Sequence, residues 1–105
     1  MVPLVIQYPV QGKGSGHDFE KRNAVEDLCT DILGWTGNGE VEGGETKPGR
    51  MNVFLHVMDA EVAVRTLLEA LDEDDLLEGA ILAVAREEEP PRVLWPQDYA
   101  GAFEV

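Results

Sequence analysis

The chain has few basic residues to balance its acidic ones. Eight lysines and arginines stand against 21 aspartates and glutamates in 105 residues, so the formal net charge is −13. Nucleic acids and anionic membranes are bound through Lys and Arg, and the charge therefore argues against both as partners. It favours a basic protein as a partner, because opposite charges steer association. An acidic surface that serves solubility alone is the other interpretation.

Cysteines and long apolar runs are scarce as well. The single Cys29 excludes an intramolecular disulfide, which is typical of a protein from a reducing compartment. No apolar run approaches the roughly 20 residues that a membrane span needs, and the first residues lack the pattern of a signal peptide. These features predict a soluble, cytoplasmic protein, and the length predicts one domain over residues 1–105.

The sequence does contain a clear order of secondary-structure elements. Alternating or continuous apolar residues predict a strand over 2–9, a strand pair over 39–57 and a strand over 80–86. Apolar stripes at helical spacing predict helices over 17–34 and 59–72. The order β-α-β-β-α-β predicts an α+β fold of the split βαβ type. We expect a four-stranded antiparallel sheet of order 4-1-3-2, with two helices on one face.

Two regions outside this pattern carry further expectations. The short, acidic, glycine-broken stretch 40–44 suits an edge strand, because such a strand resists pairing with another molecule. The core then spans about 2–86, and the extension 87–105 is too aromatic to be a free linker. We expect it to pack on the domain, with a short strand at 92–95 beside the fourth strand. We also expect Trp35 to pack across the end of the first helix.

The open face of the predicted sheet is a candidate ligand or partner surface. Asn52, Phe54 and His56 alternate with the apolar residues of their strand, so they point away from the helices. In RNA-recognition domains of this topology, aromatic residues at such positions stack on bases, but no Lys or Arg accompanies Phe54 here. Phe54 and His56 suit a small-molecule or protein site. Alternatively, Trp95, Tyr99 or Phe103 from the extension covers this face, or the strand is shifted by one residue and Phe54 belongs to the core.

The loop 12–17 is a second candidate, with Lys13, Ser15 and His17. It follows a strand and opens a helix, where backbone N–H groups can face an anion. It matches neither the Walker A pattern nor the dinucleotide fingerprint, and acidic residues in the first helical turn would repel a phosphate. We favour a flexible connection. A small-ligand or regulatory site that combines this loop with the open face is the alternative.

Two acidic clusters form the candidate surface for a basic partner. Its residues are Asp72, Glu73, Asp74, Asp75, Glu87, Glu88 and Glu89. Aligned as a calcium loop from Asp72, the chain places Leu77 where glycine is required. No spacing of histidines and cysteine matches a zinc site. We therefore expect no metal ion and no cofactor.

No catalytic motif is present. A nucleophile and a base could be proposed in Ser15 with His17, or in Cys29 with either histidine, but nothing in the sequence indicates that they are hydrogen-bonded. Cys29 lies on the apolar helical stripe, and we expect it to be a buried small hydrophobe. An enzyme with His17 or His56 as acid and base is the least favoured function. The oligomeric state is open between monomer and homodimer.

The middle of the chain looks like the centre of small bacterial ferredoxin-like domains. The stretches that carry this resemblance are Gly37-Asn38-Gly39-Glu40, Gly43-Gly44 and 51–57, followed by Asp59. Over residues 2–86 the chain resembles the ferredoxin-like superfold. Without a cysteine cluster, the resemblance implies topology and no iron–sulfur chemistry, and a fold alone does not give a function. The best prediction is a small acidic interaction domain of the inhibitor or immunity type that binds a basic protein.

Overall fold

The computed structural model describes residues 1–105, which form one antiparallel sheet and two helices. The elements, in chain order, are β1 (Val2–Pro9), α1 (Gly16–Thr36), β2 (Gly39–Lys47), β3 (Arg50–Val57), α2 (Ala60–Glu73), β4 (Ile81–Val84) and β5 (Arg92–Trp95). The sheet has the order β2-β3-β1-β4-β5, and all four strand pairs are antiparallel. Neither helix has the length and apolar character that a membrane crossing requires.

The predicted order of the first four strands is confirmed, and a fifth strand extends the sheet. β1 pairs with β3 and β4, and β3 pairs with β2, as in the expected order 4-1-3-2. β5 pairs with β4 at the place expected for residues 92–95. The sheet therefore consists of the four strands of the expected order and the additional short strand expected over 92–95. β4, at Ile81–Val84, is also shorter than the strand predicted over 80–86.

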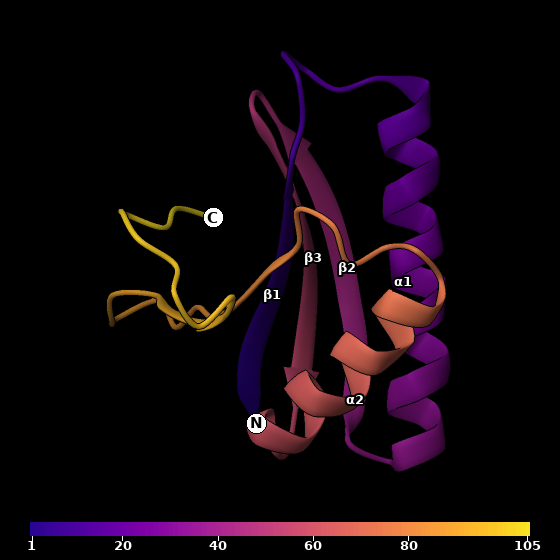
Figure 1. Ribbon diagram of the computed structural model, residues 1–105. Coiled ribbons are helices and arrows are strands. Elements are labelled where there is room, and N and C mark those ends of the chain that lie inside the picture. Colours follow the sequence, from indigo (N-terminus) through magenta and orange to yellow (C-terminus); the bar gives the residue numbers. More distant parts are fainter.

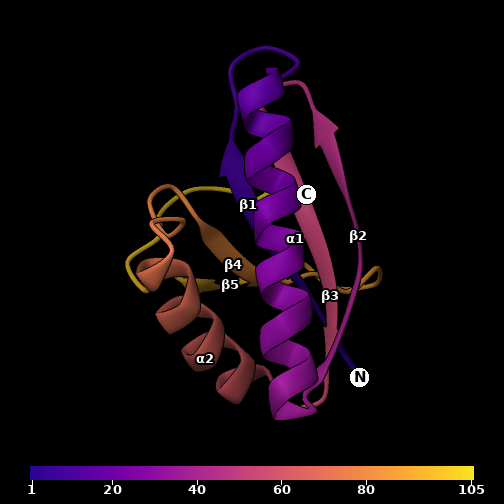
Figure 2. The same ribbon diagram turned by 90° about the vertical axis from the view of Figure 1, so that its right-hand side faces the viewer.

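The two helices cover one face of the sheet, and the C-terminal extension crosses the other. In Figure 1 the sheet is seen nearly edge-on, with α1 and α2 on its right and the yellow extension on its left. Figure 2 shows α1 lying lengthwise in front of the sheet, with α2 beside it and β2 at one side of the view. We call the face without helices the open face. It is the face on which Asn52, Phe54 and His56 were expected.

Both helices begin at residues that satisfy the free backbone N–H groups of a first turn. The Ser15 side chain accepts from the Asp18 N–H, and Asp18 in turn accepts from the Ser15 N–H at 2.9 Å, which is a capping box. Asp59 caps α2 by accepting from the Val62 N–H at 3.1 Å. α1 ends at Gly37, whose φ of 65° is the left-handed conformation that glycine adopts without strain.

The main core lies between the sheet and the helices. It comprises 16 buried residues: Leu4, Ile6, Tyr8, Val25, Cys29, Leu33, Met51, Val53, Leu55, Val57, Ala63, Leu67, Leu71, Ala80, Leu82 and Val84. On β1 and β3 these residues alternate with those of the open face, as the period of two in a strand requires. Leu76 and Leu77, which follow α2, are partly buried and pack against this core.

The prediction that Trp35 packs across the end of α1 is wrong. Its residue surface is 88% exposed, the largest value among the large apolar residues. Val25, Cys29 and Leu33 make the buried stripe of α1, and Trp35 lies two residues beyond Leu33, about 200° further around the helix. Because α1 continues to Thr36 and does not stop at Gly34, Trp35 stays on the helical surface and faces away from the core.

Candidate functional site

One half of the open face is covered by the C-terminal extension through polar contacts. The Gln7 side-chain nitrogen donates to Asn52 Oδ1 at 2.9 Å and to the Glu104 carbonyl at 2.6 Å. Lys47 Nζ donates to the Val105 carbonyl at 3.2 Å. Asn52 is fully buried. Asn52 was a candidate for binding a ligand, but in the structure it accepts from Gln7, the side chain that also donates to the extension.

An apolar contact completes this cover. Phe103 lies in a small cluster with Val5 of β1 and Ala83 of β4, and it is 9% exposed. Tyr99 meets the Phe103 ring edge-on, with 6.4 Å between the ring centroids. The extension therefore forms a strand beside β4 and also crosses the open face. Of the three aromatic residues considered for this role, Phe103 makes the buried contact.

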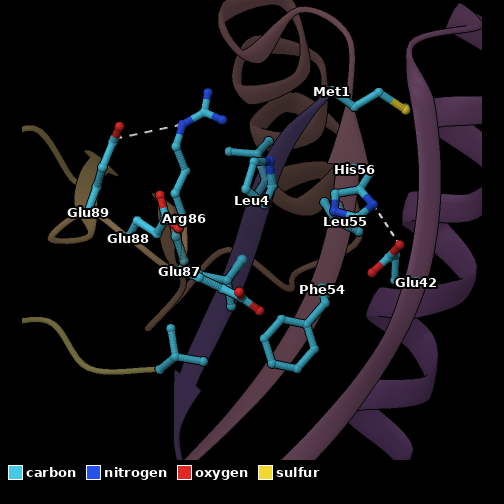
Figure 3. A pocket seen from close by; sticks show the side chains of 14 residues that line it. Met1, Leu4, Glu42, Phe54, Leu55, His56, Arg86, Glu87, Glu88 and Glu89 are labelled. Carbon is cyan, nitrogen blue, oxygen red and sulfur yellow. Dashed lines mark ion pairs between the residues drawn. The ribbon is translucent and has the colours of Figure 1, made fainter.

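The other half of the open face holds a pocket of about 690 Å³. It is lined by Met1, Pro3, Leu4, Val5, Glu42, Phe54, Leu55, His56, Ala85, Arg86, Glu87, Glu88, Glu89 and Val105. We call it the open-face pocket. Its floor is apolar, with Phe54 half-buried and Val105 of the extension at the border. Figure 3 shows the ring of Phe54 between the Glu42–His56 side of the pocket and the Arg86–Glu89 side.

A bulge in β2 brings a carboxylate onto the first side of the pocket. The strand register shifts between Val41 and Gly43, so that Glu42 is an extra residue beside β3. Its carboxylate lies 2.6 Å from His56 Nδ1 (Figure 3). Glu42 was not among the residues expected at this surface. The consecutive glycines 43–44 within a strand were the signal that could have indicated the bulge.

The opposite side of the pocket is the turn that follows β4. Arg86 Nε lies 3.9 Å from the Glu89 carboxylate, and both side chains are largely exposed. Glu87 and Glu88 form no ion pair. Four glutamates line the pocket, and Arg86 is the one lysine or arginine among its lining residues. The structure thus brings the predicted residues Phe54 and His56 together with the predicted cluster Glu87–Glu89.

The loop 12–17 lies at the other end of the sheet. Gly12 accepts a backbone hydrogen bond from Gly49, in the turn that precedes β3, whereas His56 is near the far end of β3. Six residues of strand separate Arg50 from His56, which is about 20 Å. Lys13 and His17 are exposed, and the Ser15 hydroxyl belongs to the helix cap. The structure does not join this loop with the open face in a single site.

The acidic cluster Asp72–Asp75 is also remote from the pocket. It closes α2 on the helix side of the sheet, and all four residues are exposed. None of them takes part in an ion pair or lines the open-face pocket. The two acidic clusters that were predicted as one partner surface are therefore separate, and only the 87–89 cluster borders a cavity.

The two groups with strongly shifted pKa values lie in the core under the helices. Burial raises the pKa of the Cys29 thiol to about 12, and the nearby charge of Glu26 adds to the effect. Burial also raises the pKa of the Tyr8 phenol, with a further contribution from Cys29. The Tyr8 hydroxyl donates to the Leu76 carbonyl at 2.7 Å. A thiol that stays protonated is a poor nucleophile, and Cys29 is separated from His56 by the sheet.

The pocket side chains combine apolar surface with carboxylates and one imidazole, that of His56. The lining residues include no serine, threonine or cysteine that could serve as a nucleophile beside His56. No group of three or more His, Cys, Asp and Glu side chains is arranged to hold a metal ion. What the pocket offers is an apolar floor, an aromatic ring and a rim of carboxylates.

Comparison with known proteins gives no identification. No protein-family model, no curated protein and no solved structure matches the chain.

Proposed function

We propose that this protein binds a protein partner by receiving a lysine or arginine side chain in the open-face pocket. The observation that carries the proposal is the placement of Glu42, Glu87 and Glu88 around an apolar floor that contains Phe54. The proposal keeps the basic partner expected from the net charge. It moves the contact from both acidic clusters to the one that borders a cavity.

The dimensions and polarity of the pocket fit an amphipathic cation. The hydrocarbon stem of lysine or arginine covers apolar surface while its charged head stays near carboxylates or water. In the pocket, the stem would lie over Val5 and Phe54, and the head would meet Glu87 and Glu88, which have no ion pair of their own. A cation over the face of an aromatic ring gains further stabilisation, about 0.5–2 kcal/mol.

The charge of the whole molecule supports the same partner. A net charge of −13 attracts a basic protein over several ångströms and raises the rate of encounter. Binding of this kind weakens as salt is added, because exposed charges are screened. Inhibitors and immunity-type proteins that present carboxylates to a cationic site are the class of function that we favour.

The test compares how well the wild-type protein and two charge-reversed variants capture a partner from a lysate of the source cell. Glu87→Lys/Glu88→Lys changes the pocket rim, and Asp72→Lys/Glu73→Lys makes the same change of net charge at the end of α2. We expect the first variant to lose the captured partner and the second to retain it. Lysines in the last turn of a helix are favourable to its dipole, so the control variant should fold.

The proposal is overturned if the wild-type protein captures no partner at low or moderate salt. It is also overturned if the two variants lose the partner to the same degree, because the net charge alone would then explain binding. Circular dichroism of both variants establishes that each is folded before the comparison is made.

For the fold, we propose assignment to the ferredoxin-like superfold. The element order, the sheet order β4-β1-β3-β2 and the two helices on one face support it. The additional β5 and the extension across the open face are departures from the four-stranded pattern. An experimental structure that placed the helices on opposite faces would remove this assignment.

A further inference from the structure

Another concave surface of the molecule is a groove between α1 and β2. It has a volume of about 590 Å³ and is lined by Asn23, Glu26, Asp27, Thr30, Val41, Glu42 and Gly43. The four α1 residues are spaced at i, i+3, i+4 and i+7, so they form one stripe that follows the strand. Figure 2 shows α1 and β2 running lengthwise beside each other.

The strand that borders this groove is an open sheet edge. β2 pairs only with β3, and it ends the sheet order. It contributes nine residues without a proline, so every backbone N–H that faces outward is free to donate. The acidic composition that was expected to protect this edge repels another acidic chain, but it attracts a basic strand.

The opposite edge of the sheet, formed by β5, is poorly suited to pairing with another strand. β5 has only four residues. Pro90 and Pro91 precede it, and Pro96 follows it. Proline has no N–H to give to a strand ladder and is found at protected edges. Of the two edges, β2 alone has the length and the free donors for pairing.

Carboxylates surround the β2 edge on both faces of the sheet. Glu40 lies opposite His56 on the open-face side, and Asp27 lines the groove on the helix side. Neither forms an ion pair. Cations near β2 are concentrated at its other end, where Arg22 donates to Thr46 and Lys47 meets Glu45. Around the first half of β2, Glu40 and Asp27 are therefore unpaired, whereas Glu26 pairs with Arg22 at 3.6 Å and Glu42 lies against His56.

We infer that β2 accepts an extended, lysine- or arginine-rich segment of a partner as a sixth strand of the sheet. In such strand addition, main-chain hydrogen bonds give affinity and alternate side chains enter flanking pockets. Every second side chain of the added strand would enter the groove toward Glu26 and Asp27. The remaining side chains would lie on the open-face side near Glu40 and Glu42.

The charges disfavour a second copy of this chain as the occupant. Two chains of net charge −13 repel each other, and the β2 edge itself carries three glutamates and one lysine. Glu42 lines both the groove and the open-face pocket, so one basic partner can engage both. The inference rests on the proposed function in the shared preference for a basic partner and in Glu42, whereas the backbone edge of β2 and the α1 residues of the groove lie outside the pocket.

The test uses the full chain and an eight-residue peptide of alternating lysine and valine. A second peptide of the same charge carries N-methyl groups on two adjacent central residues, which blocks hydrogen bonding from both of its edges. We expect methylation to weaken binding about tenfold, since several backbone hydrogen bonds are lost. We also expect the unmethylated peptide to slow amide hydrogen exchange in β2.

Charge-reversed variants test the groove separately from the pocket. Asp27→Lys, on the groove wall, should weaken binding of the unmethylated peptide about threefold more than Glu69→Lys, an exposed change on α2. Glu87→Lys/Glu88→Lys should leave the exchange protection of β2 in place. Three outcomes would each overturn the inference. The two peptides could bind with equal affinity, the peptide could slow amide hydrogen exchange in β5 and not in β2, or Asp27→Lys and Glu69→Lys could weaken binding equally. If the inference holds while the pocket variant still captures the cellular partner, the proposed function alone is wrong.

Discussion

The two faces of the sheet are covered by very different means. Two helices seal one face with 16 buried residues, whereas the extension covers about half of the other with Phe103 and a few polar contacts. The same strands supply both faces, because neighbouring residues on β1 and β3 point in opposite directions. The completely covered face carries the stability of the fold, and the partly covered face is where side chains remain free to bind.

Two neighbouring residues of β3 give the largest contrast between the faces. Leu55 lies under the helices and is 1% exposed, so Leu55→Ala should lower the free energy of unfolding by about 3 kcal/mol. Phe54 is half-buried on the open face, and Phe54→Ala should cost about 1 kcal/mol. Urea denaturation of both variants measures the difference. Equal losses would mean that the open face is as much a core as the helix-covered face.

The cover on the open face should have an intermediate effect. Phe103→Ala removes a ring that packs on Val5 and Ala83, and we expect a loss of about 2 kcal/mol, below the value for a deep core because the surroundings can collapse. Tyr99→Phe, which removes only an exposed hydroxyl contact to Ala102, is the control and should cost less than about 0.5 kcal/mol. A loss for Phe103→Ala no larger than that of the control would show that the extension is not part of the cooperative fold.

The alternation of apolar residues was enough to predict which strand residues face the helices. A shift of one residue would have placed every side chain of β3 on the wrong face, and the structure confirms Met51, Val53, Leu55 and Val57 in the core. The capping residues Ser15 and Asp59 were also predictable, because a helix start leaves local N–H groups to satisfy. These features depend on residues close together in the sequence.

The composition of the pocket was only partly predictable. Phe54, His56 and Glu87–Glu89 were candidates, but in two separate proposals, since nothing in the sequence shows that a turn after β4 faces the end of β3. Glu42 reaches His56 through a bulge, which depends on how β2 pairs. Asn52 was assigned to a binding surface, and its hydrogen bonds to Gln7 and Glu45 were not foreseen. These contacts join residues far apart in the chain, and the strand register decides them.

The smallest predicted effect is a dependence of stability on pH that arises from the helix-covered face and not from the open face. The folded protein holds the Cys29 proton until about pH 12, whereas the unfolded chain releases it near pH 8.5. The folded state therefore binds more protons in this range, and stability falls as pH rises, by about 1 kcal/mol between pH 9 and 10. Cys29→Ala should remove this slope relative to the wild type, whereas Phe54→Ala on the open face should keep it. Thermal unfolding at several pH values measures both slopes, and an unchanged slope in Cys29→Ala would show that the thiol is not held protonated under the helices.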